Sequence, residues 1–443
     1  MHFLCNNAAQ IIFKKDLTVL IEFKVTNFRS INGTQTLSMV AGSGTELKGV
    51  NTFASGLPSL PDITRSAVIY GPNAAGKSNL LRAMQFMQNF VLTSQSMQEG
   101  QSINVTSFLL NSKSRTEPSE FEVIFIQDKV RYQYGFAVNN TRVINEWLLA
   151  YPEGRPQRWF ERVYDPKKGG DDWHFGSRFS GPRSMIDVWQ KATRQNGLFL
   201  STAIQLNSEQ LKPVFGWFQQ KLAVILPSGD INLQFSIEQC ASEEGKKRVM
   251  EFMSSADISI TGIELKKIPF SSDILPPGLP QEIKEMFLRD MHGKEITKVS
   301  FLHKAGDSGD VIPFDISEES GGTQKLFAFA GPLLDVLAKG RILFVDEMDT
   351  SLHPLMVRFL ISLIHNPEIN KNNAQLVFTT HDTSVLDTDI FRRDQVWFVE
   401  KDSESATKLY PLTEFSPRKG EALERGYLNG RYGALPFIGE FKF

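Results

Sequence analysis

Polar and apolar residues alternate in several short segments in the first half of the chain. Residues 21–25 read Ile-Glu-Phe-Lys-Val, and four later segments repeat the alternation. A period of two is typical of half-buried β-strands. Asn139-Asn140 and Gly169-Gly170 separate some of these segments and are typical of hairpin turns. The later segments are residues 121–125, 132–138, 143–151 and 158–164. We therefore expect an antiparallel sheet here.

Three apolar segments are uninterrupted and predict strands buried on both faces. They are residues 67–70, 342–345 and 376–378. Strands of this kind are typical of the sheets of α/β proteins. The first is followed by a glycine-containing loop and then, over residues 79–91, by apolar residues at helical spacing. The pattern predicts an α/β fold with this strand, loop and helix near its centre.

The middle of the chain has a different period. Between residues 184 and 292, four segments carry apolar residues three to four positions apart, which predicts helices. They are residues 184–195, 208–223, 243–255 and 281–292. None has sustained heptads, so a long coiled-coil arm is excluded. We expect residues 184–292 to form a mainly helical insertion. Residues 1–20 share no pattern with the strand segment after them, and we expect them to form an N-terminal extension.

Composition narrows the class of protein. The 443 residues include 48 basic and 50 acidic side chains, a net charge of −2, which argues against a globally basic nucleic-acid coat. The hydrophobic fraction of 41% is enough for a sizeable core. The two cysteines, Cys5 and Cys240, indicate neither a metal framework nor a disulfide-rich secreted protein. No apolar run approaches membrane-spanning length. We expect a soluble cytoplasmic protein without a membrane partner.

Residues 71–78 read Gly-Pro-Asn-Ala-Ala-Gly-Lys-Ser and match the phosphate-binding P-loop pattern GxxxxGK[ST]. The loop stands between a predicted strand and a predicted helix, the context that this pattern requires. Backbone N–H groups and the helix N-terminus would surround phosphate oxygens. Lys77 would reach the β- and γ-phosphates, and the Ser78 hydroxyl would ligate Mg²⁺. The expected nucleotide contacts are Asn73, Ala74, Ala75, Gly76, Lys77, Ser78 and Asn79.

Two carboxylates follow the apolar strand at residues 342–345. Asp346 would hold Mg²⁺, directly or through water, as the acidic residue of a Walker B strand does. Glu347 would polarise the attacking water as a general base. A strand that simply ends in surface acids is the alternative interpretation of an isolated Asp-Glu pair. The motifs around this pair argue against it.

Three further features accompany these carboxylates. Upstream, Ser320-Gly321-Gly322 opens a predicted helix and would form an anion-binding turn. Downstream, Asp349 lies in a polar turn. His381 then stands at the tip of the strand at residues 376–378, from which it could touch a γ-phosphate oxygen.

The order of these motifs resembles the heads of ABC-type ATPases, the class that includes transporter and SMC-like ATPases. The resemblance implies an ATPase with ATP and Mg²⁺ bound between two heads in a head-to-tail dimer. Ser320, Gly321, Gly322 and Asp349 would then act on the nucleotide of the partner head. Asn27-Phe28-Arg29-Ser30 also resembles the first-strand motif of SMC-like and OLD ATPases, which implies that Arg29 lies close to the nucleotide.

Two details depart from the pattern of this family. Glu319 precedes the signature serine where leucine is usual. The family's glutamine loop cannot be placed among Gln127, Gln133 and other glutamines. The resemblance divides the rest of the chain into three parts. Residues 21–183 form the N-terminal part of the head, with the antiparallel β subdomain, and residues 184–292 form the insertion. Residues 293–443 form the C-terminal part of the head, with the signature, the Walker B strand and His381.

The segment at residues 431–437 resembles the endings of OLD-like, AAA-labelled ATPases of anti-phage and abortive-infection systems, in particular those of PARIS type. This implies a sensor that holds and releases a toxic effector when it detects a phage protein, within a homo-oligomer. OLD nucleases carry a TOPRIM domain after the head, but only about sixty residues follow His381 here. We therefore expect a separate TOPRIM-type nuclease partner.

Other functions remain open at this point. One is an SMC-like DNA-repair or recombination ATPase that engages duplex DNA over the closed heads, so nucleic acid stays a candidate partner. DNA-stimulated ATP hydrolysis with a steep salt dependence would favour it. A self-sufficient nuclease and a transporter subunit are further alternatives.

Overall fold

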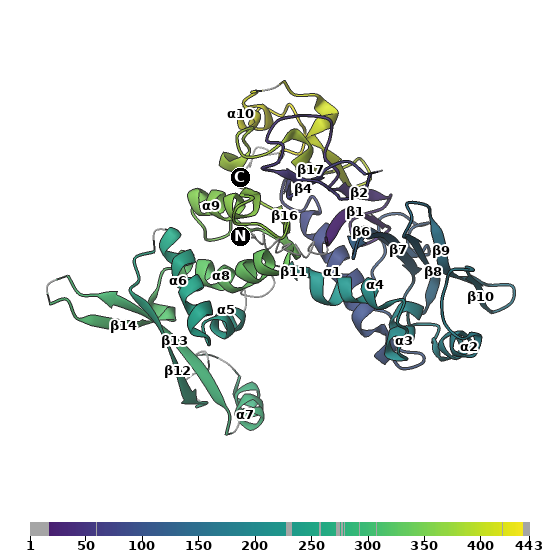
Figure 1. Ribbon diagram of the computed structural model, residues 1–443, viewed down its shortest axis with the longest axis horizontal. Coiled ribbons are helices and arrows are strands. Elements are labelled where there is room, and N and C mark those ends of the chain that lie inside the picture. Colours follow the sequence, from purple (N-terminus) through teal and green to yellow (C-terminus); the bar gives the residue numbers. More distant parts are fainter. Residues whose placement is uncertain are drawn as a thin grey trace, which may run out of the picture.

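The computed structural model describes residues 17–436, apart from residues 59, 227–232, 257, 272–274, 276, 277, 279, 292, 307 and 419. Its centre is a six-stranded sheet in the order β11-β15-β16-β5-β17-β18, of which β11, β16 and β17 are labelled in Figure 1. All neighbours pair in parallel except β17 and β18. The strands are β5 Ser66–Tyr70, β11 Leu222–Ile225, β15 Ile342–Val345, β16 Gln375–Thr379, β17 Val396–Lys401 and β18 Thr407–Pro411. The carboxyl ends of the parallel strands meet at one edge, where open α/β sheets bind their ligands.

The second sheet is antiparallel and contains the alternating segments. Its seven strands follow the order β10-β9-β8-β7-β6-β1-β2 (Figure 1). They are β1 Val19–Thr26, β2 Gln35–Ser38, β6 Ser119–Gln127, β7 Val130–Val138, β8 Val143–Tyr151, β9 Gln157–Asp165 and β10 Gly170–Phe175. Val19 and Leu20, expected in an extension, are buried in β1 because they complete its pairing with β6. The rest of that expected extension, residues 1–16, lies outside the described residues.

Alternate residues of the central strands face two different apolar cores. Ile69 and Phe344 join the core shared with α1 (Lys77–Thr93) and the antiparallel sheet. Val68 and Val345 face the other core, with α8 (Gly321–Lys339) and α9 (Pro354–His365). Both faces of the central sheet are therefore covered, as the uninterrupted apolar runs predict. The α/β fold class with an antiparallel β subdomain is confirmed.

The stretch expected as a helical insertion also supplies a central strand. The predicted helix at residues 208–223 stops in a π-helical turn, Trp217–Lys221, and Leu222 begins β11. Leu222 and the rest of β11 pair with β15, and this pairing outweighs the local helical spacing. The helices in this stretch are α2 Arg183–Ala192, α3 Phe199–Gln205, α4 Lys212–Gly216, α5 Leu233–Gln239, α6 Glu243–Ser255 and α7 Gln281–Asp290.

A third sheet extends away from the body of the molecule, at the lower left of Figure 1. It consists of β12 Gly262–Pro269, β13 Glu295–Lys304 and β14 Val311–Asp315, with α7 between β12 and β13 in the chain. We call residues 262–315 the β arm. It leads directly into the 3-10 turn Ile316–Glu318 and then into α8, so the arm adjoins the Ser-Gly-Gly turn in sequence.

The remaining elements are short. The strands β3 Thr52–Phe53 and β4 Ile63–Thr64 pair with each other, and α10 Leu423–Leu428 lies near the end of the described chain. Among the described helices, none combines the length and apolar character that crossing a bilayer would require.

Candidate nucleotide-binding site

The P-loop follows β5 and ends where α1 begins at Lys77, as the motif predicts. Two glycines are required by geometry. Gly71 has a φ of 154°, and a Cβ there would lie 2.2 Å from the Val399 carbonyl oxygen. Gly76 has a φ of 113°, and its Cβ would lie 2.1 Å from Thr407 Oγ1. Only a residue without a side chain fits such positions.

The Lys77 side chain is buried and folds back over its own loop. Its Nζ donates hydrogen bonds to the carbonyl oxygens of Gly71, at 2.8 Å, and Pro72, at 3.2 Å. Burial lowers the pKa of Lys77, and the carboxylates of Asp346, Glu347 and Asp349 oppose that shift. A cation with only carbonyl partners in a loop of this shape can transfer to phosphate oxygens.

Asp346 stands at the end of β15 with one oxygen satisfied and one open. Its Oδ1 accepts a 2.6 Å hydrogen bond from the Thr379 hydroxyl. Its Oδ2 is buried and has no hydrogen-bond partner among the described residues. A buried carboxylate oxygen without a partner costs free energy unless a cation or donor joins it. Oδ2 therefore fits a Mg²⁺ ligand, either direct or through water.

Glu347 is held in an unusual backbone conformation beside Asp346. Its φ is 50°, in the left-handed region, and its N–H donates to Thr379 Oγ1 at 2.7 Å. The Thr379 hydroxyl thus fixes both residues of the acidic pair. No sequence pattern indicated this role, because Thr379 lies on a different strand, β16, and looks like an ordinary strand residue.

His381 and Asp349 are brought together after β16 and β15. The His381 N–H donates to Asp349 Oδ2 at 3.2 Å, while Asp349 Oδ1 is buried without a partner among the described residues. Partial burial and the positive charge of Lys77 lower the pKa of His381, against the effect of the neighbouring carboxylates. His381 thus favours the neutral form, in which one ring nitrogen donates and the other accepts.

The signature turn caps α8. Ser320 Oγ accepts from the Thr323 N–H at 3.1 Å, as an N-cap serine does. A Cβ on Gly322 would lie 3.2 Å from the Ser351 carbonyl oxygen, so this side of the turn packs on the segment after Glu347. A Cβ on Gly321 would meet no atom of the described residues within 4 Å, so within that part of the chain this side of the turn is open.

Within one chain, the first turns of α8 and the acidic pair line one cavity of about 430 Å³. Gly321 and Lys325 belong to its wall together with Asp346 and Glu347, whereas no residue of the P-loop does. Burial lowers the pKa of Lys325, and the charges of Asp349 and Glu347 oppose that effect. Sequence reasoning missed Lys325, although it follows the signature closely.

A chain of hydroxyl and amide groups supports the P-loop from behind. Asn79 Nδ2 donates to Ser30 Oγ at 2.7 Å, and Ser30 Oγ lies 2.8 Å from Thr407 Oγ1. Thr407 Oγ1 donates to the Ala75 carbonyl at 2.8 Å. Arg29, beside Ser30, has a φ of 52° and places its guanidinium 5.6 Å from the centre of the Phe28 ring. The Asn-Phe-Arg-Ser turn therefore reaches the P-loop through Ser30.

The glutamine loop stays unassigned. Gln127 and Gln133 lie on β6 and β7, where they bond to Thr18, Glu122 and other neighbours in the antiparallel sheet. Among the described residues, no group of three or more His, Cys, Asp and Glu side chains is arranged to hold a metal ion.

Residues 66–191 and 253–387 match a protein-family model described as "AAA domain, putative AbiEii toxin, Type IV TA system". The match takes in the P-loop, the signature, the acidic pair and His381. The chain belongs to this AAA domain family. Its α/β core with the P-loop and its antiparallel subdomain are the two parts that the motif order predicts for an ABC-type ATPase head.

Solved structures with a similar arrangement include the "SMC head domain from Thermotoga maritima", with 13% identity, 88% of this chain and 98% of that chain covered, and a TM-score of 0.39. The structure of the SmcHead bound to the C-winged helix domain of ScpA is 16% identical in sequence, with 88% of this chain and 97% of that chain covered and a TM-score of 0.40. The structure of the recombination mediator protein RecF with ATP is 13% identical, with 89% of this chain and 100% of that chain covered and a TM-score of 0.35. No curated protein matches the chain.

Proposed function

We propose that this AAA-family protein binds and hydrolyses ATP with Mg²⁺ and uses the nucleotide as a conformational switch. The open Asp346 Oδ2, buried at the end of β15, is the observation that carries this proposal. It supplies a carboxylate oxygen that suits a cation, and among the described residues the P-loop lysine donates hydrogen bonds to the Gly71 and Pro72 carbonyls. Mg²⁺ would neutralise charge on the phosphates and be held by Asp346 and Ser78.

Other groups of the chain would bind the phosphates and activate the attacking water. Lys77 would move from the Gly71 and Pro72 carbonyls to the phosphates, and the loop N–H groups of residues 73–79 would surround them. Glu347 would orient and deprotonate the attacking water, with its backbone held by Thr379. His381 would contact a γ-phosphate oxygen.

The switch itself would need two chains. Ser320, Gly321 and Gly322 form a helix N-terminus with an open side at Gly321, which suits an anion presented by a partner chain. ATP offers a γ-phosphate to that turn and ADP does not, so only ATP stabilises the closed head-to-tail pair. Asp349 would act on the same partner nucleotide, and Arg29 on the nucleotide of its own chain.

Two variants test this proposal. Glu347→Gln should hydrolyse ATP at least about a hundredfold more slowly, as loss of a general base implies, and should form an ATP-dependent dimer in light scattering. Lys77→Ala should bind no ATP, and its molar mass in light scattering should be the same with and without ATP. Normal turnover by purified Glu347→Gln protein would remove the general-base assignment.

The biological role that we propose is phage defence. The family description names a toxin of a type IV toxin–antitoxin system. The overall layout of the chain and the segment at residues 431–437 resemble AriA, the ATPase of the PARIS anti-restriction-sensing system. By this resemblance the chain would form a homo-oligomer, hold a separate TOPRIM-type nuclease like AriB, and release it when a phage protein binds. The neighbouring gene should then encode such a nuclease. Equal phage resistance from wild type and Lys77→Ala would contradict this role.

A further inference from the structure

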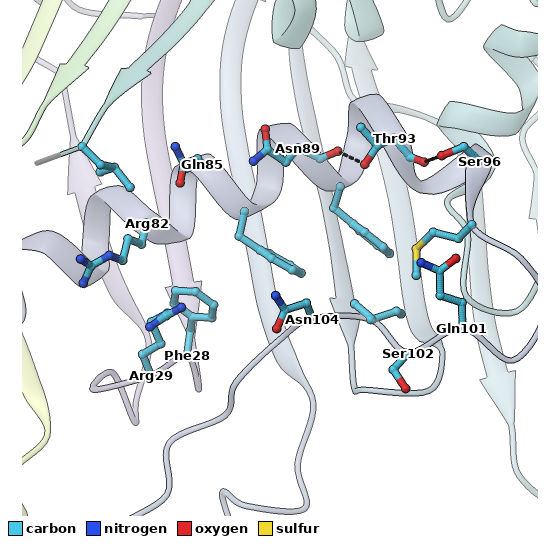
Figure 2. A pocket seen from close by; sticks show the side chains of 15 residues that line it. Phe28, Arg29, Arg82, Gln85, Asn89, Thr93, Ser96, Gln101, Ser102 and Asn104 are labelled. Atoms are coloured by element: carbon cyan, nitrogen blue, oxygen red, sulfur yellow. Dashed lines mark hydrogen bonds between the residues drawn. The ribbon is translucent and has the colours of Figure 1, made fainter. Parts of the chain in front are cut away.

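A second cavity, distinct from the one beside Asp346, runs along α1 (Figure 2). It has a volume of about 560 Å³ and lies between α1 and residues 101–104. Among the residues that the structure describes, the walls of the two cavities have Leu226 alone in common. We call this second cavity the α1 groove. Its α1 wall consists of Arg82, Gln85, Phe86, Asn89, Phe90 and Thr93. The spacing of these residues places them along one side of the helix.

The charge of the α1 groove is concentrated at one end. Arg29 and Arg82 are both at that end in Figure 2. The described residues of the wall include no Asp, Glu or Lys. Within the same part of the chain, neither arginine has a carboxylate partner, and the Arg82 side chain makes a long 3.4 Å hydrogen bond to Asn79 Oδ1. Two guanidiniums without a counter-charge favour a carboxylate or phosphate at this end.

Several carboxamide side chains lie among the other residues along the rest of the α1 groove. Asn89 projects from α1, and Asn104 lies on the opposite wall in Figure 2. The side chains of Gln85, Asn89 and Asn104 have no hydrogen-bond partner within the part of the chain that the structure describes. A carboxamide both donates and accepts, so such a row can pair with the N–H and C=O groups of a peptide main chain whatever its side chains.

The length of the α1 groove suits a short extended peptide. From Arg82 to Thr93, α1 advances about 16 Å at 1.5 Å per residue. An extended chain covers that distance in about five residues.

The aromatic residues of the α1 groove argue against a nucleic-acid strand. Phe86 stacks on Phe90, with ring centres 5.6 Å apart and planes at 11°. Phe28 packs against Phe121 and Phe86. Single-stranded nucleic acid is bound by free aromatic faces and by cations that follow its backbone. Here the ring faces are occupied by one another, and the cations stand at one end only.

We propose that the α1 groove binds an extended peptide segment of a partner protein. A carboxylate of that segment is held by Arg82 at the charged end, and its main chain pairs with Gln85, Asn89 and Asn104. The site adjoins the P-loop support, because Ser30 follows Arg29 and bonds to Asn79, one turn before Arg82. Peptide binding in the α1 groove goes beyond ATP hydrolysis and does not depend on it.

Selection from a displayed library of random hexapeptides tests this inference on the full-length protein. Peptides enriched by the wild type should share an Asp, a Glu or a free C-terminal carboxylate near one end. Arg82→Gln should lose that enrichment. Arg155→Gln serves as the matched control, since it removes an exposed arginine from the turn between β8 and β9, away from the α1 groove, and it should keep the enrichment.

The affinity of one enriched peptide then gives the size of the effect. By fluorescence anisotropy, Arg82→Gln should weaken binding at least about tenfold, the loss expected for a hydrogen bond to a charged group. Replacing the acidic residue of the peptide by its amide should weaken wild-type binding similarly and Arg82→Gln binding little. Enrichment without an acidic residue, no enrichment, or equal selection by Arg82→Gln would overturn the inference. So would binding of a single-stranded oligonucleotide that Arg82→Gln abolishes.

Discussion

The Thr379 hydroxyl donates a 2.6 Å hydrogen bond to Asp346 and accepts a 2.7 Å hydrogen bond from the N–H of Glu347. One side chain on β16 thereby positions both acidic residues that follow β15. Thr379→Val keeps the shape but removes both bonds. We expect ATP hydrolysis to fall about tenfold and the Mg²⁺ requirement to rise, because a buried carboxylate loses a charge-assisted bond.

Steady-state hydrolysis measured against Mg²⁺ concentration checks this expectation. Thr379→Ser retains the hydroxyl and is the control, with activity close to that of the wild type. If Thr379→Val matches Thr379→Ser in both rate and Mg²⁺ dependence, the hydroxyl has no part in positioning the acidic pair.

Gly76 should tolerate no side chain. Gly76→Ala combines a φ of 113° with a Cβ that meets Thr407 Oγ1 at 2.1 Å, so the P-loop must shift. We expect ATP affinity to fall by at least about tenfold, with about 1–3 kcal/mol of strain. Gly33→Ala is the matched control, since nothing lies within 4 Å of a Cβ at that position. Isothermal titration with a slowly hydrolysed ATP analogue measures both, and equal affinities would contradict the steric argument.

A polar side-chain pair connects the β arm to the residue in front of the signature. His303 Nε2 on β13 lies 2.7 Å from the carboxylate of Glu319, the residue in front of Ser320. The His303 ring also packs on Phe314 of β14, with ring centres 4.9 Å apart. We expect Glu319→Gln and His303→Gln each to lower ATP turnover about threefold to tenfold, because the signature turn loses its link to the arm.

A double-mutant cycle tests whether His303 and Glu319 act through their shared contact or independently of each other. The double variant should be no slower than the worse single variant, and nucleotide affinity of the isolated chain should stay unchanged in all three. Additive losses would show that the two side chains act separately.

His365 gives the fold a pH dependence with a defined sign. Burial, with a smaller contribution from Arg65, lowers the pKa of His365 to about 3. The unfolded side chain takes up a proton as the pH falls through 6.5, while the folded one stays neutral until about pH 3. The contribution of His365 to the free energy of unfolding should therefore be complete above pH 6.5. As the pH decreases from 6.5, the free energy of unfolding should fall by about 1.4 kcal/mol per pH unit for one proton.

Denaturant unfolding between pH 7 and pH 4 measures this slope. His365→Gln cannot take up the proton, so its stability should fall less steeply than that of the wild type over the same range. The hydroxyl of Ser66, 2.7 Å from His365 Nε2, keeps a polar partner for the glutamine. Parallel slopes for the two proteins would show that His365 titrates in the folded state.

The sequence predicted the elements whose signal is local. The P-loop, the acidic pair and the strand at residues 342–345 lie where their motifs place them, because buried strands and phosphate loops are specified by a few consecutive residues. The β arm was missed although Val299 and Phe301 alternate with polar residues in β13. Its last strand, β14, is exposed along nearly its whole length and shows no such alternation. Thr379 and Thr407 were missed for another reason. Their roles depend on contacts with residues far away in the sequence, which no local pattern encodes.

The Thr407 contact also has a consequence for the order in which the protein can become functional during synthesis. The P-loop ends at residue 78, but the hydroxyl that holds the Ala75 carbonyl comes from a strand more than three hundred residues later. A nascent chain that has released only its first half carries the complete phosphate-binding motif without the strand that supports it. Capture of ATP would therefore await nearly the whole chain, and a truncated product that lacks β18 would not compete for nucleotide.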